Sequence, residues 1–186
     1  MQKCYDNGWI SPRDGNISFR KRNSFHYYIS PGGVRKYDID EDDILKLNLF
    51  NNTVIENYGD LKPSGEIVLH NLILKDQNYI HQDLCVIHCH PPHILAFIGM
   101  LKSNRELNYI REVFPEIDQR IKIGKNVDYI EARTDKLGLS TYKNIKNNSI
   151  VALKRHGVVS IGETFQDAME NIETLEYYCR IFLMEK

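Results

Sequence analysis

The chain has 186 residues, enough for one domain with a substantial hydrophobic core, and we expect residues 1–186 to form a single domain. Its 24 lysines and arginines almost balance 25 aspartates and glutamates, so no overall positive field would attract nucleic acid. The longest apolar stretch, residues 94–101, is too short to span a bilayer, and residues 1–10 lack a hydrophobic signal core. The sequence therefore predicts a cytoplasmic protein without a nucleic-acid or membrane partner.

Short strands are predicted in the first third of the chain. A turn signal at Asp14-Gly15 is followed by alternating residues over 17–20, which indicate a strand. Residues 25–29 form a second, aromatic strand that ends at a proline and two glycines. Leucine alternates with polar residues over 45–49, the pattern of a half-buried strand.

A buried helix and a central strand are predicted next. Pro63 suits the first turn of a helix, and the helix predicted over residues 63–74 is apolar around most of its circumference. Residues 84–89 are apolar on both faces, as in a central strand covered by helices. The two prolines that follow are expected to open a helix that runs to Leu101.

The last part of the chain is expected to add two strands and a long helix. The strands cover residues 150–153 and 158–161, and Thr164 with Asp167 has the pattern of a helix N-cap. An apolar stripe then continues to Phe182, which indicates core packing or a subunit interface. Interleaved strands and helices with hairpins predict an α/β fold, a three-layer α/β/α sandwich with a mixed, largely antiparallel central sheet.

Three histidines are candidate metal ligands. His88 and His90 are two residues apart on a predicted strand, so both side chains face the same way, while Cys89 faces the core. His156 precedes a glycine in a predicted turn. Three histidines with one open position are typical of catalytic zinc. A structural zinc with a fourth ligand is the alternative, and His70, His93 or Glu66 would supply that ligand.

Glu66 is a candidate acid–base residue, because it lies in a predicted helix that is otherwise apolar. A buried carboxylate without a partner has a raised pKa, which suits proton transfer near neutral pH. One glycine turn, at Gly15, precedes the first strand, and another, at Gly32-Gly33, follows the second strand. Ser64 lies at a helix start, so these segments are candidates for phosphate binding. None matches the P-loop or the dinucleotide fingerprint, so ATP and NAD are not supported.

Taken together, the motifs resemble the class II aldolase/adducin family, and within it the L-fuculose-1-phosphate aldolase branch. The resemblance covers nearly the whole chain and rests on five motifs in order and spacing. These are Gly15-Asn16-Ile17-Ser18, Ser30-Pro31-Gly32-Gly33, Pro63-Ser64-Gly65-Glu66, His88-Cys89-His90-Pro91-Pro92 and His156-Gly157.

The resemblance implies a homo-oligomer, a tetramer with active sites at subunit boundaries, and a small-molecule sugar phosphate as substrate. It implies zinc, or another divalent metal, on the three histidines. Glu66 would be the acid–base residue, and Tyr109 from a neighbouring subunit would be the proton donor. The phosphate would be held by five residues: Gly15, Asn16, Gly32, Gly33 and Ser64. The expected reaction is reversible cleavage of a ketose 1-phosphate to dihydroxyacetone phosphate and an aldehyde.

Two residues differ from the family pattern: Gly65 replaces a serine, and Arg133 stands where related chains often have glycine. The resemblance also implies a C-terminal segment, closing the site, beyond the helix that ends this sequence. Another lyase or epimerase on the same scaffold (a dehydratase, a decarboxylase or a 4-epimerase) is the nearest alternative. A non-catalytic, adducin-like binding module is the second, although such a module does not need three histidines and Glu66.

Overall fold

The computed structural model describes residues 1–102 and 105–185, and its centre is a sheet of seven strands. The sheet has the order β4-β3-β2-β1-β5-β7-β6, and every neighbouring pair of these strands is antiparallel. Among the described residues, parallel pairing is confined to isolated bridges of Ile123 and Val127 with β6. The strands are β1 (Asn16–Arg20), β2 (His26–Ile29), β3 (Leu45–Asn48), β4 (Val54–Glu56), β5 (Leu84–Cys89), β6 (Ile150–Leu153) and β7 (Gly157–Gly162).

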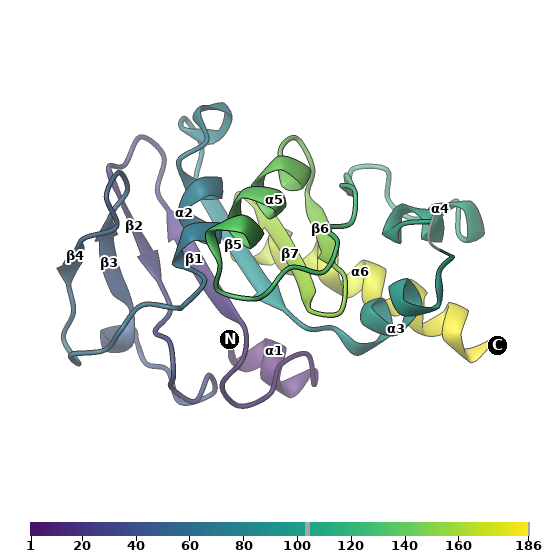
Figure 1. Ribbon diagram of the computed structural model, residues 1–186, viewed down its shortest axis with the longest axis horizontal. Coiled ribbons are helices and arrows are strands. Elements are labelled where there is room, and N and C mark those ends of the chain that lie inside the picture. Colours follow the sequence, from purple (N-terminus) through teal and green to yellow (C-terminus); the bar gives the residue numbers. More distant parts are fainter. Residues whose placement is uncertain (103–104, 186) are drawn as a thin grey trace.

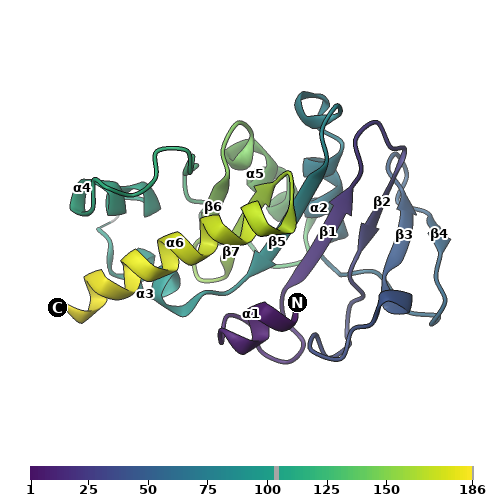
Figure 2. The ribbon, with the colours of Figure 1, turned by 180° about the vertical axis from the view of Figure 1, so that it is seen from behind.

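Helices cover both faces of this sheet (Figures 1 and 2). On one face α2 and α5 form a hydrophobic core with the sheet, and on the other face α3 and α6 form a second core. The predicted three-layer α/β/α sandwich is therefore confirmed. The helices are α1 (Gln2–Asp6), α2 (Ile67–Leu74), α3 (Pro92–Met100), α4 (Ile110–Val113), α5 (Asp135–Ile145) and α6 (Phe165–Met184), with short 3₁₀ turns at Glu41–Asp43, Gln77–Tyr79 and Leu107–Tyr109.

Strand β5 is central, as its apolar sequence predicts, and all six of its residues are buried. Its side chains alternate between the two cores: Ile87 and Cys89 join the core of α3 and α6, while Leu84 and Val86 join that of α2 and α5. His88 therefore projects toward the α2 face. Cys89 faces the opposite core, as predicted.

The start of α2 differs from the prediction. The helix begins at Ile67, not at Pro63, because Pro63 forms an isolated bridge with Pro31. The backbone N–H of Ser64 also donates to the carbonyl oxygen of Ser30, at 3.3 Å. These contacts hold the segment before the helix against the end of β2.

The predicted cap of α6 is confirmed. Thr164 Oγ1 accepts a hydrogen bond from the Asp167 backbone, and the Asp167 carboxylate accepts one from the Thr164 N–H. The stripe that follows is buried at Ile172 and Leu175, whereas Phe165, the first residue of the helix, is 40% exposed. The helix α6 thus packs on β5, β7 and α3, and the ring of its first residue, Phe165, lies 6.2 Å from that of Phe19 in β1.

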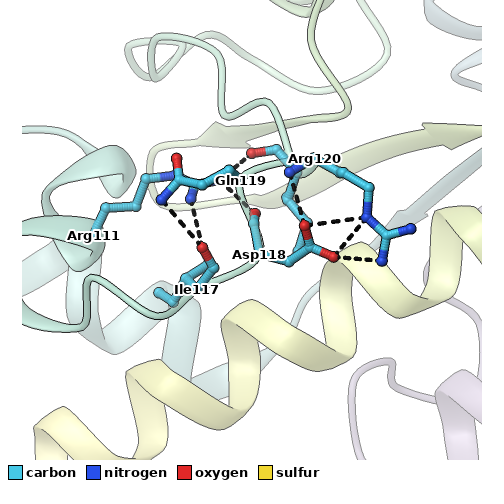
Figure 3. A network of polar contacts seen from close by, with 6 residues as sticks. Arg111, Ile117, Asp118, Gln119 and Arg120 are labelled. Atoms are coloured by element: carbon cyan, nitrogen blue, oxygen red, sulfur yellow. Dashed lines mark hydrogen bonds and ion pairs between the residues drawn. The ribbon is translucent and has the colours of Figure 1, made fainter.

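The segment between α4 and α5 was not assigned from the sequence, and arginine contacts hold part of it (Figure 3). Arg111 donates hydrogen bonds to the carbonyl oxygens of Ile117 and Asp118, at 2.9 and 3.0 Å. Arg120 binds the Asp118 carboxylate, with an Nη2–Oδ2 distance of 2.7 Å. These contacts stabilise a turn with little regular structure. Among the described residues, no helix has both the length and the apolar character needed to cross a membrane.

Arg20, at the end of β1, is fully buried and ties the sheet to the end of α2. Its guanidinium donates to the carbonyl oxygens of Leu74, Tyr79 and Ile80, at 2.7, 2.6 and 3.2 Å. We expect Arg20→Met to lower the free energy of unfolding by about 3 kcal/mol or more, because these carbonyls lose their donors. Urea unfolding measures this change. The exposed Arg22→Met is the control and should change stability by about 0.5 kcal/mol or less; equal effects of the two variants would contradict the prediction.

Candidate active site

His88, near the end of β5, is oriented by the neighbouring strand. Its Nδ1 lies 2.9 Å from the carbonyl oxygen of Val158 in β7, and a carbonyl oxygen only accepts, so Nδ1 carries the hydrogen. In the neutral ring the lone pair is then on Nε2, which is the usual arrangement of a metal-ligating histidine. That Nε2 lies 3.1 Å from Nε2 of His90.

The structure brings the three predicted histidines together. His90 follows the end of β5, where its backbone N–H donates to the carbonyl oxygen of Trp9 at 2.7 Å, and His156 lies in the turn before β7. One ring nitrogen from each of the three lies within 4.8 Å of the others. The expected juxtaposition is therefore confirmed, and the role of these residues as metal ligands stays a prediction.

Gly157 permits this approach of β7 to the histidines. A Cβ atom on residue 157 would lie 2.4 Å from the carbonyl oxygen of Cys89, 2.6 Å from Cδ2 of His90 and 3.0 Å from Cε1 of His88. Two of these distances are shorter than real Cβ contacts. The glycine after His156 is thus required by the close packing of the turn on the histidine pair.

The donor set suits zinc or another divalent metal. Imidazole nitrogens are preferred zinc ligands, and burial together with the neighbouring histidines lowers the pKa of His90 to about 4 and lowers the pKa of His156. Both rings are therefore neutral at pH 7, the state that binds metal. In the described part of the chain, Glu66 Oε1 and His156 Nδ1 are buried without a hydrogen-bond partner, as expected beside a cation.

Two of the three residues proposed as a fourth ligand for a structural metal are engaged elsewhere. His70 lies between Ser18 and Asn16, with both ring nitrogens in hydrogen bonds. His93 lies at the start of α3, and its Nδ1 is 2.7 Å from the carboxylate of Glu176 in α6. Only Glu66 remains close to the cluster.

Glu66 is the N-cap residue of α2, and its side chain points at the histidines. It is 7% exposed; Oε2 accepts a hydrogen bond from Asn16 Nδ2 at 3.0 Å and lies 3.3 Å from His88 Nε2. Oε1 lies 3.5 Å from His156 Nε2. The sequence thus placed this carboxylate correctly beside the candidate ligands.

The expected raised pKa of Glu66 is wrong. Burial raises the pKa, but the electrostatic interaction with His88, the hydrogen bond from Asn16 and the electrostatic interaction with His156 outweigh burial and lower the pKa of Glu66 to about 2. The prediction assumed a carboxylate without partners, and the structure provides several. Glu66 is therefore ionised at neutral pH, the form that a base requires.

A buried hydrogen-bond chain positions the Glu66 carboxylate. Ser18 Oγ lies 2.6 Å from His70 Nδ1, and His70 Nε2 is hydrogen-bonded to Asn16 Oδ1. Because the amide oxygen of Asn16 only accepts, Nε2 of His70 carries the hydrogen. The amide nitrogen of Asn16 is then free to donate to Glu66. His70 thus fixes the orientation of the amide that holds the carboxylate.

Acid should destabilise the fold through His70. Burial, the largest influence, lowers the pKa of His70 to about 3, whereas an unfolded histidine titrates near 6.5. Between these values the unfolded chain binds a proton that the folded chain does not, so stability is present above pH 6.5 and is lost as pH falls toward 3. When the pH is lowered from 7 to 5, the free energy of unfolding should fall in both proteins. We expect this fall to be about 2 kcal/mol smaller in His70→Gln than in the original chain.

Urea unfolding of chelator-treated protein at the two pH values measures this difference. The exposed His81→Gln is the matched control and should keep the original acid sensitivity. If His70→Gln lost as much stability in acid as the original chain, the assignment of a buried neutral His70 would be wrong.

The predicted phosphate-binding residues line one cavity together with the histidines and Glu66. The cavity has a volume of about 130 Å³, and larger hollows, of about 480, 620, 390 and 270 Å³, are lined by other residues. The Gly32 N–H donates to the carbonyl oxygen of Lys62 at 2.9 Å, which joins the glycine turn to the loop before α2. The full lining is Arg13, Asp14, Gly15, Asn16, Gly32, Gly33, Lys36, Ser64, Gly65, Glu66, His88, His90, Ala132, Arg133 and His156.

Sequence reasoning missed the basic residues Arg13 and Lys36. The guanidinium of Arg13 donates to the carbonyl oxygen of Gly33, and Lys36 Nζ donates to that of Pro31. Arg13 directly precedes the Asp14-Gly15 turn, which was a usable signal. Lys36 has no sequence signal, because its burial depends on how residues 30–36 fold back.

Tyr109 is not among the residues that line this cavity. It lies in the 3₁₀ turn before α4, where its ring is stacked with that of Phe97 at 6.4 Å and the Arg105 guanidinium lies 3.8 Å from its centroid. The prediction places Tyr109 at the active site of a neighbouring subunit, which a single chain does not test, and the role stays a prediction.

The family model "Class II Aldolase and Adducin N-terminal domain" matches residues 1–183. The chain belongs to this family. An L-fuculose phosphate aldolase of Methanocaldococcus jannaschii is 31% identical over 98% of this chain and 91% of the relative. A methylthioribulose-1-phosphate dehydratase of Komagataella phaffii is 25% identical over 96% of this chain and 77% of the relative.

Solved structures of the class II aldolase and adducin family share the fold. An L-fuculose 1-phosphate aldolase superposes with a TM-score of 0.77 over 99% of this chain and 81% of that chain, at 19% identity. The family includes both aldolases and a dehydratase, so membership alone leaves the reaction and the substrate open.

Proposed function

We propose that the protein is a metal-dependent aldehyde-lyase that reversibly cleaves a ketose 1-phosphate, such as L-fuculose 1-phosphate, to dihydroxyacetone phosphate and an aldehyde. The observation that carries the proposal is the buried Glu66 carboxylate, 3.3 Å from His88 and 3.5 Å from His156, beside three clustered histidines in a cavity lined by glycine turns. The name of the M. jannaschii relative supports the same reaction class.

His88, His90 and His156 would hold zinc or another divalent cation. When bound, this cation supplies Lewis-acid polarisation of the ketone oxygen of the substrate. Glu66 is not needed as a ligand, because three imidazole nitrogens complete the protein part of a catalytic site.

Glu66 acts as the base at the nucleophilic carbon. In the direction of synthesis, its carboxylate takes a proton from the hydroxymethyl carbon of dihydroxyacetone phosphate, and that carbon forms the new bond to the aldehyde. Asn16 holds Oε2, so Oε1 is the oxygen left to carry the proton. In cleavage the same carboxyl group returns the proton to carbon.

The phosphate group is held where the glycine turns meet the loop before α2. Gly15, Asn16, Gly32, Gly33 and Ser64 line the cavity, and the glycines, which lack side chains, let the backbone approach an anion closely. Gly33 has a φ of 74°, a conformation that favours glycine.

The proposal includes a second copy of the chain. Tyr109 of a neighbouring subunit would donate the proton to the aldehyde oxygen, in a homotetramer located in the cytoplasm. The position of Tyr109 outside the cavity of its own chain is compatible with this arrangement.

Product analysis tests the proposal. The zinc-loaded protein is incubated with several ketose 1-phosphates, and dihydroxyacetone phosphate is detected with a coupled dehydrogenase while the mixture is examined by NMR. Release of dihydroxyacetone phosphate with an equal amount of aldehyde supports the lyase. Loss of water, loss of carbon dioxide or inversion at C4 would instead identify a dehydratase, a decarboxylase or an epimerase. No reaction and no metal binding would favour a binding module.

A further inference from the structure

Gly65 and Arg133, from distant parts of the chain, lie against each other at the cavity. A Cβ atom on residue 65 would come within 2.9 Å of Arg133 Cδ and within 3.2 Å of its Cγ and Nε. Real Cβ atoms essentially never approach another heavy atom within 3.0 Å, so a serine at position 65 would force the arginine to move. The Arg133 side chain therefore lies where it would collide with a side chain on residue 65.

The backbone of Arg133 is strained. Its φ is 64°, in the left-handed region that favours glycine. In residues 1–102 and 105–185, four of the six non-glycine residues with positive φ are asparagine or aspartate, which tolerate this region better than arginine does. Strained residues cluster at functional sites, where the surrounding structure maintains them. Here a long cationic side chain is kept where glycine would relieve the strain.

The Arg133 guanidinium is available for a ligand. Within the described residues no hydrogen bond or ion pair engages it, whereas Arg13 and Lys36, the other cations of the cavity, both donate to backbone carbonyls. The cavity thus contains three cationic side chains and two carboxylates, Asp14 and Glu66. Glu66 lies beside His88 and His156, and the excess of cations over carboxylates in the lining favours an anion in the rest of the cavity.

We infer that Arg133 is a substrate-binding residue, and that its guanidinium, in the space left by the absent side chain at position 65, binds the phosphate dianion of the substrate. The inference rests on the proposed function and adds a specificity-determining contact to it. A guanidinium offers two parallel N–H donors that match phosphate oxygens, and such charge-assisted contacts are stronger than a hydroxyl contact. A serine at position 65 would offer a neutral hydroxyl contact, whereas the glycine leaves space for a charged one.

Loss of this contact should weaken phosphate binding and leave the chemical step intact. We expect Arg133→Gln to raise the Kd for dihydroxyacetone phosphate about 10- to 100-fold in the zinc-loaded protein. The Kd for inorganic phosphate should rise by a similar factor, and kcat should change less than about threefold, because the contact is uniform in ground and transition states. Titration calorimetry gives both Kd values.

A double-mutant cycle tests whether the two positions act as one unit. Gly65→Ser alone should weaken phosphate binding, because its Cβ displaces the guanidinium. In an Arg133→Gly background the same change should instead improve binding about 3- to 10-fold, because the hydroxyl now reaches the vacated space. Gly65→Ala is the matched control: it adds the Cβ without the hydroxyl and should give no recovery. Circular dichroism and zinc content confirm that each variant is folded and loaded.

The outcomes separate this inference from the proposed function. If the original protein cleaves ketose 1-phosphates but Arg133→Gln leaves both Kd values unchanged, the inference is overturned and the lyase stands. Additive effects in the cycle, or recovery by alanine as large as by serine, would also overturn it. If the zinc-loaded original protein neither binds dihydroxyacetone phosphate nor cleaves any ketose 1-phosphate, the proposed function fails and this inference fails with it.

Discussion

Glu66→Gln is expected to lower kcat by about 10²- to 10⁴-fold while the fold and the metal content stay unchanged. Glutamine has nearly the shape of glutamate, and its amide oxygen still accepts the hydrogen bond from Asn16 Nδ2. The amide cannot accept a proton near neutral pH, so proton transfer at the nucleophilic carbon loses its base. Steady-state rates, zinc content and circular dichroism of the variant measure the three parts of this expectation.

Glu163→Gln is the matched control for the loss of a carboxylate, because Glu163 is exposed and does not line the cavity. Its turnover should equal that of the original protein. If Glu66→Gln kept full activity, the base would have to be another residue. If it lost zinc together with activity, Glu66 would be a ligand, and the three-histidine assignment would need a fourth member.

Removal of one histidine should abolish both metal binding and turnover. His90→Ala is the most informative variant, because His90 lies beyond the end of β5 and is half-buried, whereas His88 is buried within the sheet. Losing even a neighbour that only orients a ligand costs about 10- to 100-fold in metal affinity, so losing a ligand should cost at least about 100-fold. Competition with a chromogenic chelator measures the affinity, and the cleavage assay measures turnover.

His81→Ala provides the comparison for this experiment, since His81 is exposed and its Nδ1 lies 3.0 Å from Asn23 Oδ1. This variant should keep stoichiometric zinc and full activity. Retention of tightly bound zinc in His90→Ala would show that residues other than His90 hold the metal. Activity without metal in that variant would remove the Lewis acid from the account.

Strong, local patterns predicted much of the fold. The apolar run of β5 required a central strand, and the Thr164–Asp167 pair marked the start of α6. Other elements lacked such a signal. Strand β4 has only three residues, which are half or fully exposed. Its sequence therefore lacks the alternation of apolar and polar residues that marks a strand packed on a core. Helix α5 contains Gly138, which lowers helix propensity but lets α5 approach α2: a Cβ there would lie 3.0 Å from Val68 Cγ1.

The candidate site also has features that the sequence predicts and features that arise only in the folded chain. The histidines and Glu66 belong to short motifs whose residue types indicate their chemistry, so the sequence identified them, and the structure brings them together. The direction of the Glu66 pKa depended on Asn16, which a long-range strand pairing brings to α2, and the prediction was therefore wrong. The contact between Gly65 and Arg133 likewise arises only in the folded chain.

Solvent deuterium exchange into dihydroxyacetone phosphate tests the central claim most directly. This half-reaction needs the metal centre and Glu66 but no aldehyde, so it does not depend on which ketose 1-phosphate is the substrate. The zinc-loaded protein in D₂O should exchange one proton of the hydroxymethyl carbon, as followed by NMR, and both chelation and Glu66→Gln should stop the exchange. No exchange by a protein with stoichiometric zinc and bound dihydroxyacetone phosphate would contradict the account.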